Sequence, residues 1–464
     1  MSALLSDDLL RRFDIPGPRY TSYPTADRFH DAFGEPDLLQ ALRERGSDAQ
    51  RAAAPLSVYV HIPFCASVCY YCACNKIITR HTERAAPYLA LLQREIGLIA
   101  THLGAGRAVS QLHLGGGTPT FFSDDELRTL MDSLRAAFGL AADGEFAIEV
   151  DPRTVTPERL QALWDMGFNR LSFGVQDFDP DVQQAVHRIQ PAQGVFDLMA
   201  AARAIGFRSI NADLIYGLPR QTPDSFARTL EQLVQLAPDR VALYAYAHLP
   251  ARFKPQRRII DAELPAPGDK LALLRGALHT LQAAGYEHIG MDHFARPDDA
   301  LAQAKAQGRL HRNFQGYSTQ PDCDLIALGV SAIGRMGDTY SQNAKTLEEY
   351  EAALGAGHLP VVRGHRLSAD DLLRRDLIMA IMCQGRLDAD ALSLRLGQPF
   401  ASAFASELAR LQPLAEAGLV DIRAGGLRVT EAGWYLVRAI AMVFDTGLNR
   451  ATAAGGRTQF SKII

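Results

Sequence analysis

Residues 57–80 read SVYVHIPFCASVCYYCACNKIITR. The run 58–62 is β-branched and aromatic, which is typical of a buried strand, and Pro63 ends it. Four of the six cysteines of the chain follow: Cys65, Cys69, Cys72 and Cys74. The stretch therefore predicts a loop that carries several thiols at the carboxyl end of a buried strand.

The first three of these cysteines have the spacing C-x3-C-x2-C, which favours an iron–sulfur cluster. A [4Fe–4S] cube normally has four cysteine ligands, so three leave one iron open to a small molecule. The spacing, with Tyr71 directly before the third cysteine, resembles the signature of the radical S-adenosylmethionine (SAM) enzymes. The resemblance implies that SAM binds the open iron and is cleaved to a 5′-deoxyadenosyl radical.

A structural zinc site is the main alternative for these thiols. It needs a fourth ligand, which Cys74, His61 or His81 would have to supply. Because C-x-C crowds two ligands, we place Cys74 outside the cluster, as a small packing residue.

The composition is that of a globular protein of two or three domains, with 464 residues, 47% hydrophobic and 22% charged. The net charge of −4 argues against a general nucleic-acid binder. No apolar run is long enough to span a membrane. Asp7 and Asp8 stand where a secretory signal would be basic and then apolar. Together with the clustered thiols, these features lead us to expect a cytoplasmic protein.

From residue 55 onward, strand and helix patterns alternate. Strands are expected at 57–62, 111–114, 146–150, 170–175, 209–215 and 240–246. Helices are expected at 83–102, 123–138, 156–166, 192–205, 222–236 and 267–284. Several of these helices begin at a capping residue (Ser123, Thr156) and end near glycine. Six such units predict an α/β fold, which we interpret as an incomplete (β/α)6 barrel like a partial TIM barrel. A doubly wound open sheet fits the alternation nearly as well.

Both architectures place a site at the carboxyl ends of the strands, where this chain has polar and glycine residues. A Gly115-Gly116-Gly117 turn, which leads into Thr118, would let backbone N–H groups approach a ligand. The other candidates at these ends are Glu149, Asp151, Gln176, Arg188 and Asp213.

We divide the chain into four parts. Residues 1–54 form an aromatic extension, expected to pack on the main domain and less readily to act as a lid. Residues 55–295 form the partial barrel, 296–360 complete and connect it, and 361–464 form a helical cap.

In the cap, helices are expected at 372–384, 388–396, 400–417 and 430–444, with a hairpin over 419–430. That order resembles a winged-helix unit, but 13 Lys and Arg against 10 Asp and Glu are no footprint for DNA.

The whole chain resembles the oxygen-independent coproporphyrinogen III oxidases. The matching stretches are PRYTSYPT, VYVHIPFCxxxCYYCxCNK, HLGGGTPT, IEVDP, LSFGVQDF, ADLIYGLPxQT, YAHLP, HIGMDHFA, RNFQGYSTQ and QFSKII. The related haem-chaperone branch usually has Phe in place of Cys74 and lacks RNFQGY, so it is the less favoured alternative.

The resemblance implies roles for particular residues. Cys65, Cys69 and Cys72 would bind the [4Fe–4S] cluster. The first SAM would be lined by Tyr59, Gly116, Glu149, Ala247 and Ile333. A second SAM would be lined by Tyr71, Gly117, Thr118, Gln176, Arg188 and Asp213. All of these match the family in type except Tyr71, where Phe is common.

The implied reaction is oxidative decarboxylation of two propionates of coproporphyrinogen III to vinyl groups, which gives protoporphyrinogen IX in haem biosynthesis. The resemblance also implies a monomer. The reaction needs an electron donor, such as a flavodoxin system, and an unidentified electron acceptor. The substrate's carboxylates should meet cations. The candidates are Arg252, Lys254, Arg257, Arg258, Arg309 and Arg312. A radical SAM enzyme for another substrate, such as a methyl transferase, is a further alternative.

Overall fold

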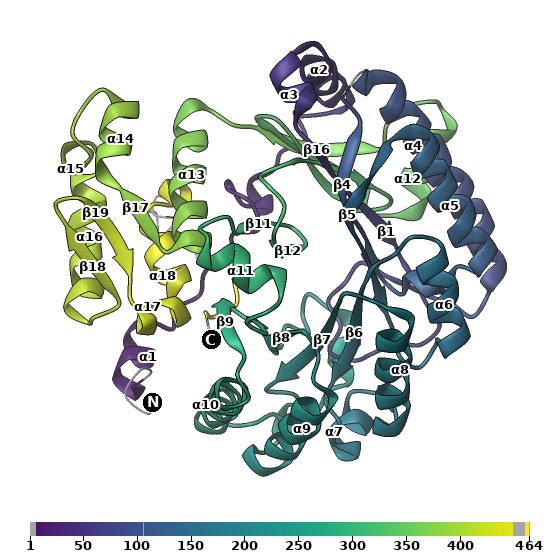
Figure 1. Cartoon of the computed structure of the whole chain (residues 1–464), viewed down its shortest axis with the longest axis horizontal. Helices are drawn as coiled ribbons and strands as arrows, with labels where there is room; N and C mark the ends of the chain where they lie inside the picture. The colour runs from purple at the N-terminus through teal and green to yellow at the C-terminus, as the bar shows by residue number, and fades with distance from the viewer. Residues whose placement is uncertain (1–5, 105, 449–459, 464) are drawn as a thin grey trace. The chain divides into compact units, whose positions relative to one another are not determined.

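The computed structural model describes residues 6–104, 106–448 and 460–463 of the chain (Figure 1). These residues form two compact units, each built from separated stretches of sequence. Unit 1 comprises Met1–Arg28, Glu287–Asp322 and Leu367–Ile464, and unit 2 comprises Phe29–Tyr286 and Cys323–Arg366.

Six parallel strands form the centre of unit 2, as the alternation of strand and helix patterns predicts. They are β1 (Leu56–Ile62), β4 (Ala108–Gly116), β5 (Gly139–Val150), β6 (Arg170–Gln176), β7 (Ser209–Tyr216) and β8 (Arg240–Ala245). They lie side by side in chain order, and each neighbouring pair is parallel. A doubly wound sheet reverses its order at a switch point, so this order counts against that alternative.

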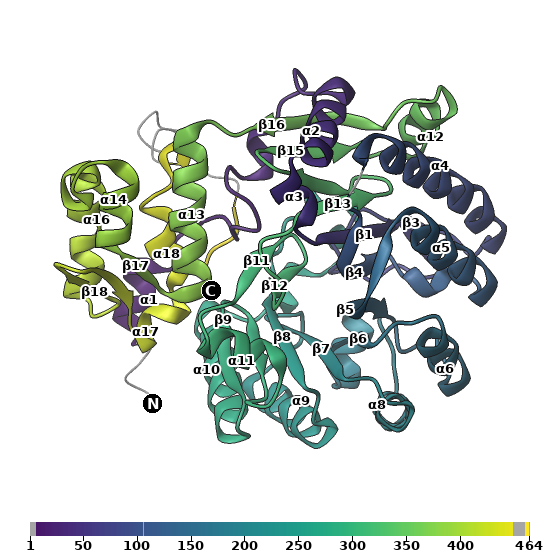
Figure 2. The ribbon, with the colours of Figure 1, turned by 45° about the horizontal axis from the view of Figure 1, so that its top comes forward.

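The expected helices are present between these strands and lie along the outer side of the sheet (Figure 2). They are α4 (Ala85–Leu103), α5 (Asp124–Ala137), α6 (Pro157–Asp165), α8 (Ala192–Ile205) and α9 (Pro223–Leu236), and α10 (Pro267–Ala283) follows β8. Ser123 and Thr156 cap α5 and α6 through their hydroxyls, as expected. Unit 2 also contains α2 (Glu35–Ser47), α3 (Ala49–Ala53), α7 (Pro180–Ala185) and α12 (Leu347–Gly355).

The sheet continues on the other side of β1 with strands that the sequence did not predict. They are β13 (Asp324–Leu328), β14 (Ile333–Met336), β15 (Thr339–Asn343) and β16 (Val361–Arg366). β13 pairs with β1 in parallel, and the pairs that follow are antiparallel. β1 therefore lies between β13 and β4, inside the sheet.

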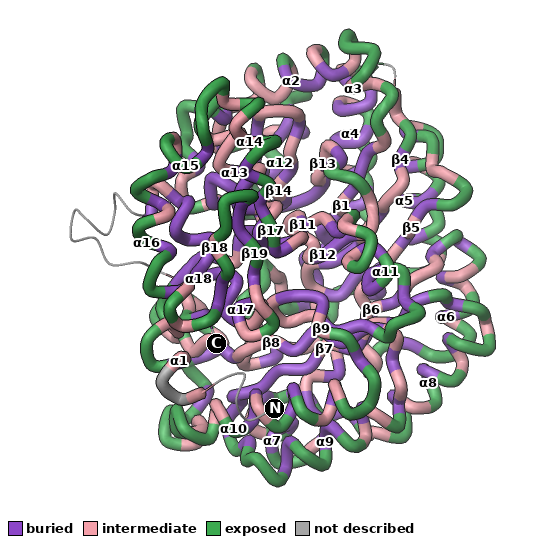
Figure 3. Tube along the Cα trace, turned by 60° about the vertical axis from the view of Figure 1, so that its left-hand side comes forward, coloured by how far each residue is buried: buried purple, intermediate pink, exposed green. Residues whose placement is uncertain are grey.

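β1 is buried along nearly its whole length, because it has strands on both sides and side chains packed on both faces. Six of its seven residues are buried, and Tyr59 alone is intermediate. In Figure 3 the strands are mostly buried, whereas helices such as α6 and α8 alternate between buried and exposed positions. The cysteine loop therefore starts from a rigid strand.

Unit 1 contains a small sheet in the order β17-β19-β18 among short helices. Its C-terminal elements are α13 (Ala369–Gln384), β17 (Arg386–Asp388), α14 (Ala389–Leu396), α15 (Phe400–Ala403), α16 (Ala405–Glu416), β18 (Val420–Arg423), β19 (Gly426–Val429), α17 (Glu431–Tyr435) and α18 (Val437–Met442). The helix expected over 400–417 is broken at Phe404, whose ring is buried against Phe400 and Phe444. The helix expected over 430–444 is likewise divided, at Leu436.

The other elements of unit 1 are short. They are α1 (Asp7–Phe13), β9 (Glu287–Gly290), β10 (His293–Ala295), α11 (Ala300–Ala306), β11 (His311–Asn313) and β12 (Gly316–Ser318). In the described part of the chain, no helix combines the length and apolarity needed to cross a bilayer.

The aromatic residues of the N-terminal stretch divide between the two units. Tyr20 and Tyr23 are buried inside unit 1, whereas Phe29 is buried in unit 2, stacked on Tyr340. The Tyr20 hydroxyl donates to the carboxylate of Asp445 (3.1 Å), and that of Tyr23 lies 3.3 Å from the hydroxyl of Thr446. Because Asp445 is fully buried, its charge needs such donors, and these come from the N-terminal stretch.

Candidate active site

The cysteine loop is closed at its base by two short strands, β2 (Phe64–Cys65) and β3 (Ile77–Ile78). They pair in parallel, and the N–H of Ile77 donates to the carbonyl of Pro63 (2.7 Å). The N–H of Thr79 donates to the carbonyl of Cys65 (2.9 Å). The loop between these strands therefore holds Cys69, Cys72 and Cys74 at a fixed distance from the end of β1.

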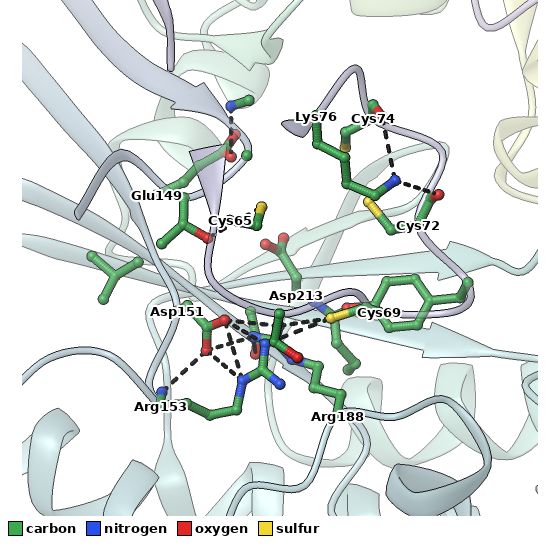
Figure 4. Close-up of a pocket in the computed structure, with 18 of the residues that line it drawn as sticks. Cys65, Cys69, Cys72, Cys74, Lys76, Glu149, Asp151, Arg153, Arg188 and Asp213 are labelled. Atoms are coloured by element: carbon green, nitrogen blue, oxygen red, sulfur yellow. Dashed lines mark hydrogen bonds and ion pairs between the residues drawn. The ribbon is translucent and has the colours of Figure 1, made fainter. Parts of the chain in front are cut away.

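The loop covers a cavity of about 270 Å³ at the carboxyl ends of the parallel strands (Figure 4). All four cysteines of the loop line it. Eleven residues that the sequence assigned to the cluster or to SAM line it together: Cys65, Cys69, Tyr71, Cys72, Gly116, Gly117, Thr118, Glu149, Gln176, Arg188 and Asp213. One cavity thus collects side chains and glycines from several successive strand ends.

Three other residues assigned to SAM do not line this cavity. Tyr59 is held in β1, and its hydroxyl donates to Nδ1 of His61 (3.0 Å). Ala247 follows β8, and its carbonyl accepts from the side-chain amide of Gln256 (3.2 Å). Ile333 is the first residue of β14.

The glycine turn after β4 is required by close packing on the end of β1. Gly116 has a φ of 114°, and a Cβ there would lie 2.7 Å from Cε1 of His61. A Cβ on Gly117 would lie 2.6 Å from the carbonyl oxygen of Pro63. The Gly117 N–H donates to the carbonyl of Ile62 (2.8 Å), so this N–H is used within the protein and not toward a ligand.

All the cysteines are free thiols, and Cys65, Cys72 and Cys74 have shifted pKa values. Burial raises the pKa of Cys65 to about 11, although the hydroxyl of Thr118 donates to its Sγ (3.5 Å). A hydrogen bond with the Cys74 thiol, assisted by the ammonium of Lys76, lowers the pKa of Cys72 to about 6. The pKa of Cys74 is raised by the same hydrogen bond. Within this pair Cys72 therefore ionises before Cys74, which stays neutral as its hydrogen-bond donor.

Two arginines reach the third thiol of the set, Cys69. Arg188 donates to its Sγ at 3.5 Å and Arg153 at 3.6 Å. Both also bind Asp151, at 3.2 Å and 2.6 Å, and these charges lower the pKa of Asp151 although burial opposes its ionisation (Figure 4). Two guanidinium groups against one carboxylate leave net positive charge beside Cys69, which favours an anionic group in this part of the cavity.

Two carboxylates face the cavity with opposite pKa shifts. Burial opposes ionisation of Glu149, but donation from His113 (3.1 Å) and from the Gly116 N–H (3.3 Å) lowers its pKa. Burial and then the charge of Glu149 raise the pKa of Asp213 to about 6, although Asn211 donates to it (2.9 Å). At neutral pH the cavity can thus offer two carboxylates to a cationic ligand, and Asp213 becomes neutral first on acidification.

The donor set suits a cluster better than a single metal ion. Among the described residues, no three His, Cys, Asp or Glu side chains lie close enough to hold one ion. In a [4Fe–4S] cube each cysteine binds a different iron, so the three thiols need only surround one space, as Cys65, Cys69 and Cys72 do.

Neither histidine considered for a zinc site is available. Nδ1 of His61 accepts from Tyr59, and its Nε2 donates to the carbonyl of Asn75 (2.9 Å). His81 is exposed and pairs with Glu83 (2.9 Å). Of the three possible fourth ligands for zinc, only Cys74 therefore lies at the cavity, whereas the three thiols around one space already fit a cluster.

Sequence reasoning missed several residues of the site. Arg153 and Lys76 line the cavity, and His113 sets the charge of Glu149. Arg153 lies two positions after Asp151, just beyond the end of β5. Its place at a strand end could therefore have identified it as a candidate for the site. His113 lies inside β4, where an alternating strand pattern indicates only which face a side chain occupies.

The cations proposed for the propionates have mixed surroundings. In unit 2, Arg252 and Arg258 lie over the rings of Phe253 and Tyr70. Arg252, Lys254, Arg257 and Arg258 are all exposed. In unit 1, Arg309 binds Gln307, whereas Arg312 is buried over the ring of Tyr317.

Comparison with known proteins agrees with this site. Residues 59–233 match the family model of the radical SAM superfamily, and residues 367–436 match that of the HemN C-terminal domain. The oxygen-independent coproporphyrinogen III oxidase of Pseudomonas aeruginosa is 50% identical over 459 residues, and that of Escherichia coli is 49% identical over 456. Each alignment covers 98% of both proteins.

A solved structure extends the likeness to the fold. It is described as "Coproporphyrinogen III oxidase (HemN) from Escherichia coli is a Radical SAM enzyme". It is 50% identical in sequence, superposes with a TM-score of 0.88, and covers 92% of this chain and 97% of its own. The α/β fold of the radical SAM enzymes is thereby confirmed. The chain belongs to the family of oxygen-independent coproporphyrinogen III oxidases, which are oxidoreductases of the radical SAM superfamily.

Proposed function

We propose that this protein converts coproporphyrinogen III to protoporphyrinogen IX in haem biosynthesis, by oxidative decarboxylation of two propionates to vinyl groups. The observation that carries the proposal is the cavity in which the C-x3-C-x2-C thiols meet charged side chains from several strand ends. Relatives at 49% and 50% identity over nearly the whole chain bear the name of that activity.

Cys65, Cys69 and Cys72 would hold a [4Fe–4S] cluster with one iron open to SAM. The cluster and SAM, once bound and reduced, would supply the radical chemistry that removes a hydrogen atom from the β-carbon of a propionate. Loss of CO2 and of one further electron would then give the vinyl group. A donor such as a flavodoxin system would reduce the cluster, and a separate one-electron acceptor is needed.

The protein's own residues would bind and orient SAM. The lowered pKa of Glu149 keeps a carboxylate in the cavity to attract the ammonium group of SAM. We assign the first SAM to Tyr59, Gly116, Glu149, Ala247 and Ile333. We assign a second SAM to Tyr71, Gly117, Thr118, Gln176, Arg188 and Asp213. Eight of these eleven residues line the cavity together with the cysteines, and Tyr59, Ala247 and Ile333 lie outside its lining.

The finer architecture is also part of the proposal. We infer an incomplete (β/α)6 barrel at 55–295, completed and connected by 296–360, with an N-terminal extension at 1–54. We infer a winged-helix-like cap at 361–464, which the three-stranded sheet and helices over that stretch support. We further infer a monomer that works in the cytoplasm.

The test is product analysis on anaerobically purified protein whose cluster has been rebuilt. Dithionite or a flavodoxin system, SAM and coproporphyrinogen III would be added, and 5′-deoxyadenosine, CO2 and vinyl products measured. All three should form, and should be lost in Cys69→Ala but not in Cys383→Ala, which changes a buried thiol of unit 1. Deoxyadenosine without vinyl products would point to another substrate. Haem binding without turnover would point to a chaperone.

A further inference from the structure

Glu95 is a buried carboxylate in unit 2 that lies outside the cavity lining. It belongs to α4, and its side chain is 1% exposed. Its Oε1 accepts from the amide of Asn343 (2.6 Å). Its Oε2 accepts from the hydroxyl of Tyr350 (2.6 Å) and from the N–H of Gly329 (2.8 Å). Burying a carboxylate costs free energy unless hydrogen bonds compensate it, so the groups that donate to Glu95 are held firmly in place around it.

A second residue of α4 binds the same turn. The hydroxyl of Tyr88 accepts from the N–H of Val330 (2.9 Å) and donates to the carbonyl of His61 (2.8 Å). Glu95 and Tyr88 therefore bind two consecutive N–H groups of the turn between β13 and β14. Tyr88 also ties that turn to the last residues of β1.

The turn packs against β1 without free space. Gly329 has a φ of 96°, and a Cβ there would lie 2.5 Å from the carbonyl oxygen of His61. It would also lie 2.6 Å from the hydroxyl of Tyr88. The turn therefore lies so close to the end of β1 that position 329 has no room for a side chain, and a shift of the turn toward β1 would displace it.

The contacts continue to the cysteine loop and back. Asn343 also donates to the carbonyl of Gly329 (3.0 Å), and two residues later the carbonyl of Lys345 accepts from Asn75 (3.1 Å). The carbonyl of Asn75 in turn accepts from His61 (2.9 Å). Glu95 thus belongs to a closed ring of contacts that joins α4, the β13–β14 turn, the cysteine loop and β1.

We propose that Glu95 is a positioning residue for SAM. By holding the β13–β14 turn against the end of β1, it sets the relative places of Ile333, which follows the turn, and Tyr59, which binds His61. This inference rests on the proposed function only in assigning those two residues to SAM. Glu95 itself is not among the residues that line the cavity.

Glu95→Gln tests the proposal in the full-length protein with its cluster rebuilt. The amide has nearly the same shape, but only one of its ends can accept hydrogen bonds. If the amide oxygen of the introduced glutamine accepts the hydrogen bonds from Gly329 and Tyr350, its NH2 group faces the NH2 group of Asn343, and two donors then meet without an acceptor. Asn343 cannot turn over without losing its bond to Gly329. An unsatisfied buried group should weaken SAM binding roughly tenfold.

The readouts are SAM affinity by calorimetry and the change that SAM causes in the electron paramagnetic resonance signal of the reduced cluster. We expect iron and sulfide content to match wild type while SAM affinity falls. Gln93→Ala, on the exposed side of the same helix, should bind SAM as wild type does. Tyr350→Phe leaves the bonds from Gly329 and Asn343, and should weaken SAM binding less than Glu95→Gln.

Tyr88→Phe is the second variant, because it removes both hydroxyl contacts while the ring stays in place. We expect it to weaken SAM binding as well, and it decides the matter if Glu95→Gln does not fold. Unchanged SAM affinity in a folded Glu95→Gln variant would overturn the proposal. If Glu95→Gln does not fold, unchanged SAM affinity in Tyr88→Phe would overturn it.

The test is separate from that of the proposed function, because no porphyrin is present in these binding experiments. A protein that does not decarboxylate coproporphyrinogen can still be tested for SAM binding. A wild-type protein that does not bind SAM would overturn both proposals.

Discussion

Arg188 and Cys69 are 119 positions apart in the chain, yet the guanidinium of Arg188 donates to the Sγ of Cys69 at 3.5 Å. Arg188 is 6% exposed and is anchored by Asp151 and by the carbonyl of Gly174 (2.6 Å). A cation fixed in this way stabilises negative charge on the sulfur. It links the loop that carries the cysteines to the far side of the cavity.

Replacing Arg188 by Met should therefore make the reduction potential of the rebuilt cluster more negative, because potentials follow net charge and hydrogen bonds to sulfur. Asp151 keeps Arg153, so the fold should survive. The measurement is a redox titration followed by electron paramagnetic resonance. Arg203→Met, which removes a remote ion pair with Asp239, is the control and should leave the potential unchanged. An unaltered potential in Arg188→Met would refute the link.

The three-cysteine assignment predicts a sharp difference within the loop. Alanine at Cys65, Cys69 or Cys72 should abolish cluster incorporation, because each thiolate is taken to bind its own iron. Cys74→Ala should retain near wild-type iron and sulfide, since Cys74 is exposed and serves as a hydrogen-bond donor to Cys72. Iron and sulfide analysis after anaerobic reconstitution decides this. Loss of iron in Cys74→Ala would make Cys74 a ligand.

Gly117→Ala should damage the site through backbone displacement. The new Cβ would lie 2.6 Å from the carbonyl oxygen of Pro63. This oxygen belongs to the backbone and cannot move aside as the end of a flexible side chain could. We expect less bound cluster and a lower melting temperature. Gly97→Ala is the matched control on α4, where a Cβ meets nothing within 4 Å, and should add about 0.5–1 kcal/mol of stability. If both variants behave alike, the close packing of the turn on Pro63 has no consequence.

SAM binding should depend on the ionisation of Asp213. Its pKa is raised to about 6, so the carboxylate is charged above that pH and neutral below it. Affinity for the cationic cofactor should fall as pH drops through about 6, by up to about tenfold per pH unit. Asp213→Asn should bind more weakly at pH 7.5 and lose this dependence. Calorimetry between pH 5.5 and 7.5, with cluster absorbance checked at each point, tests it; an equal slope in the variant would contradict it.

The six parallel strands could be predicted because each is an apolar run bounded by caps and glycines, as at Ser123 and Gly206. The four strands beyond residue 322 could not, since they are short and join the sheet through the long-range parallel pairing of β13 with β1. The cysteine spacing predicted where the site lies. It did not predict that Arg153 contacts Cys69 or that His113 binds Glu149, because these contacts depend on which strands are neighbours in the sheet.

The contacts of the N-terminal aromatic stretch could not be predicted for a similar reason: Phe29 packs in unit 2, whereas Tyr20 and Tyr23 pack in unit 1. Nothing near Tyr20 in the sequence indicates that it satisfies Asp445, 425 positions later. The resemblance assigned Tyr59 to SAM, and the structure adds a contact that the sequence did not indicate, between its hydroxyl and His61. Assignments that depend on distant contacts stay predictions until ligand binding is measured.

The central claim is that a radical derived from SAM takes hydrogen from a propionate of the substrate. It is tested most directly with coproporphyrinogen III carrying deuterium at the propionate β-carbons, incubated anaerobically with the reconstituted protein, SAM and reductant. The account predicts one deuterium in each 5′-deoxyadenosine and one such molecule for each vinyl group formed. Vinyl products accompanied by unlabelled deoxyadenosine, or formed without SAM, would contradict it.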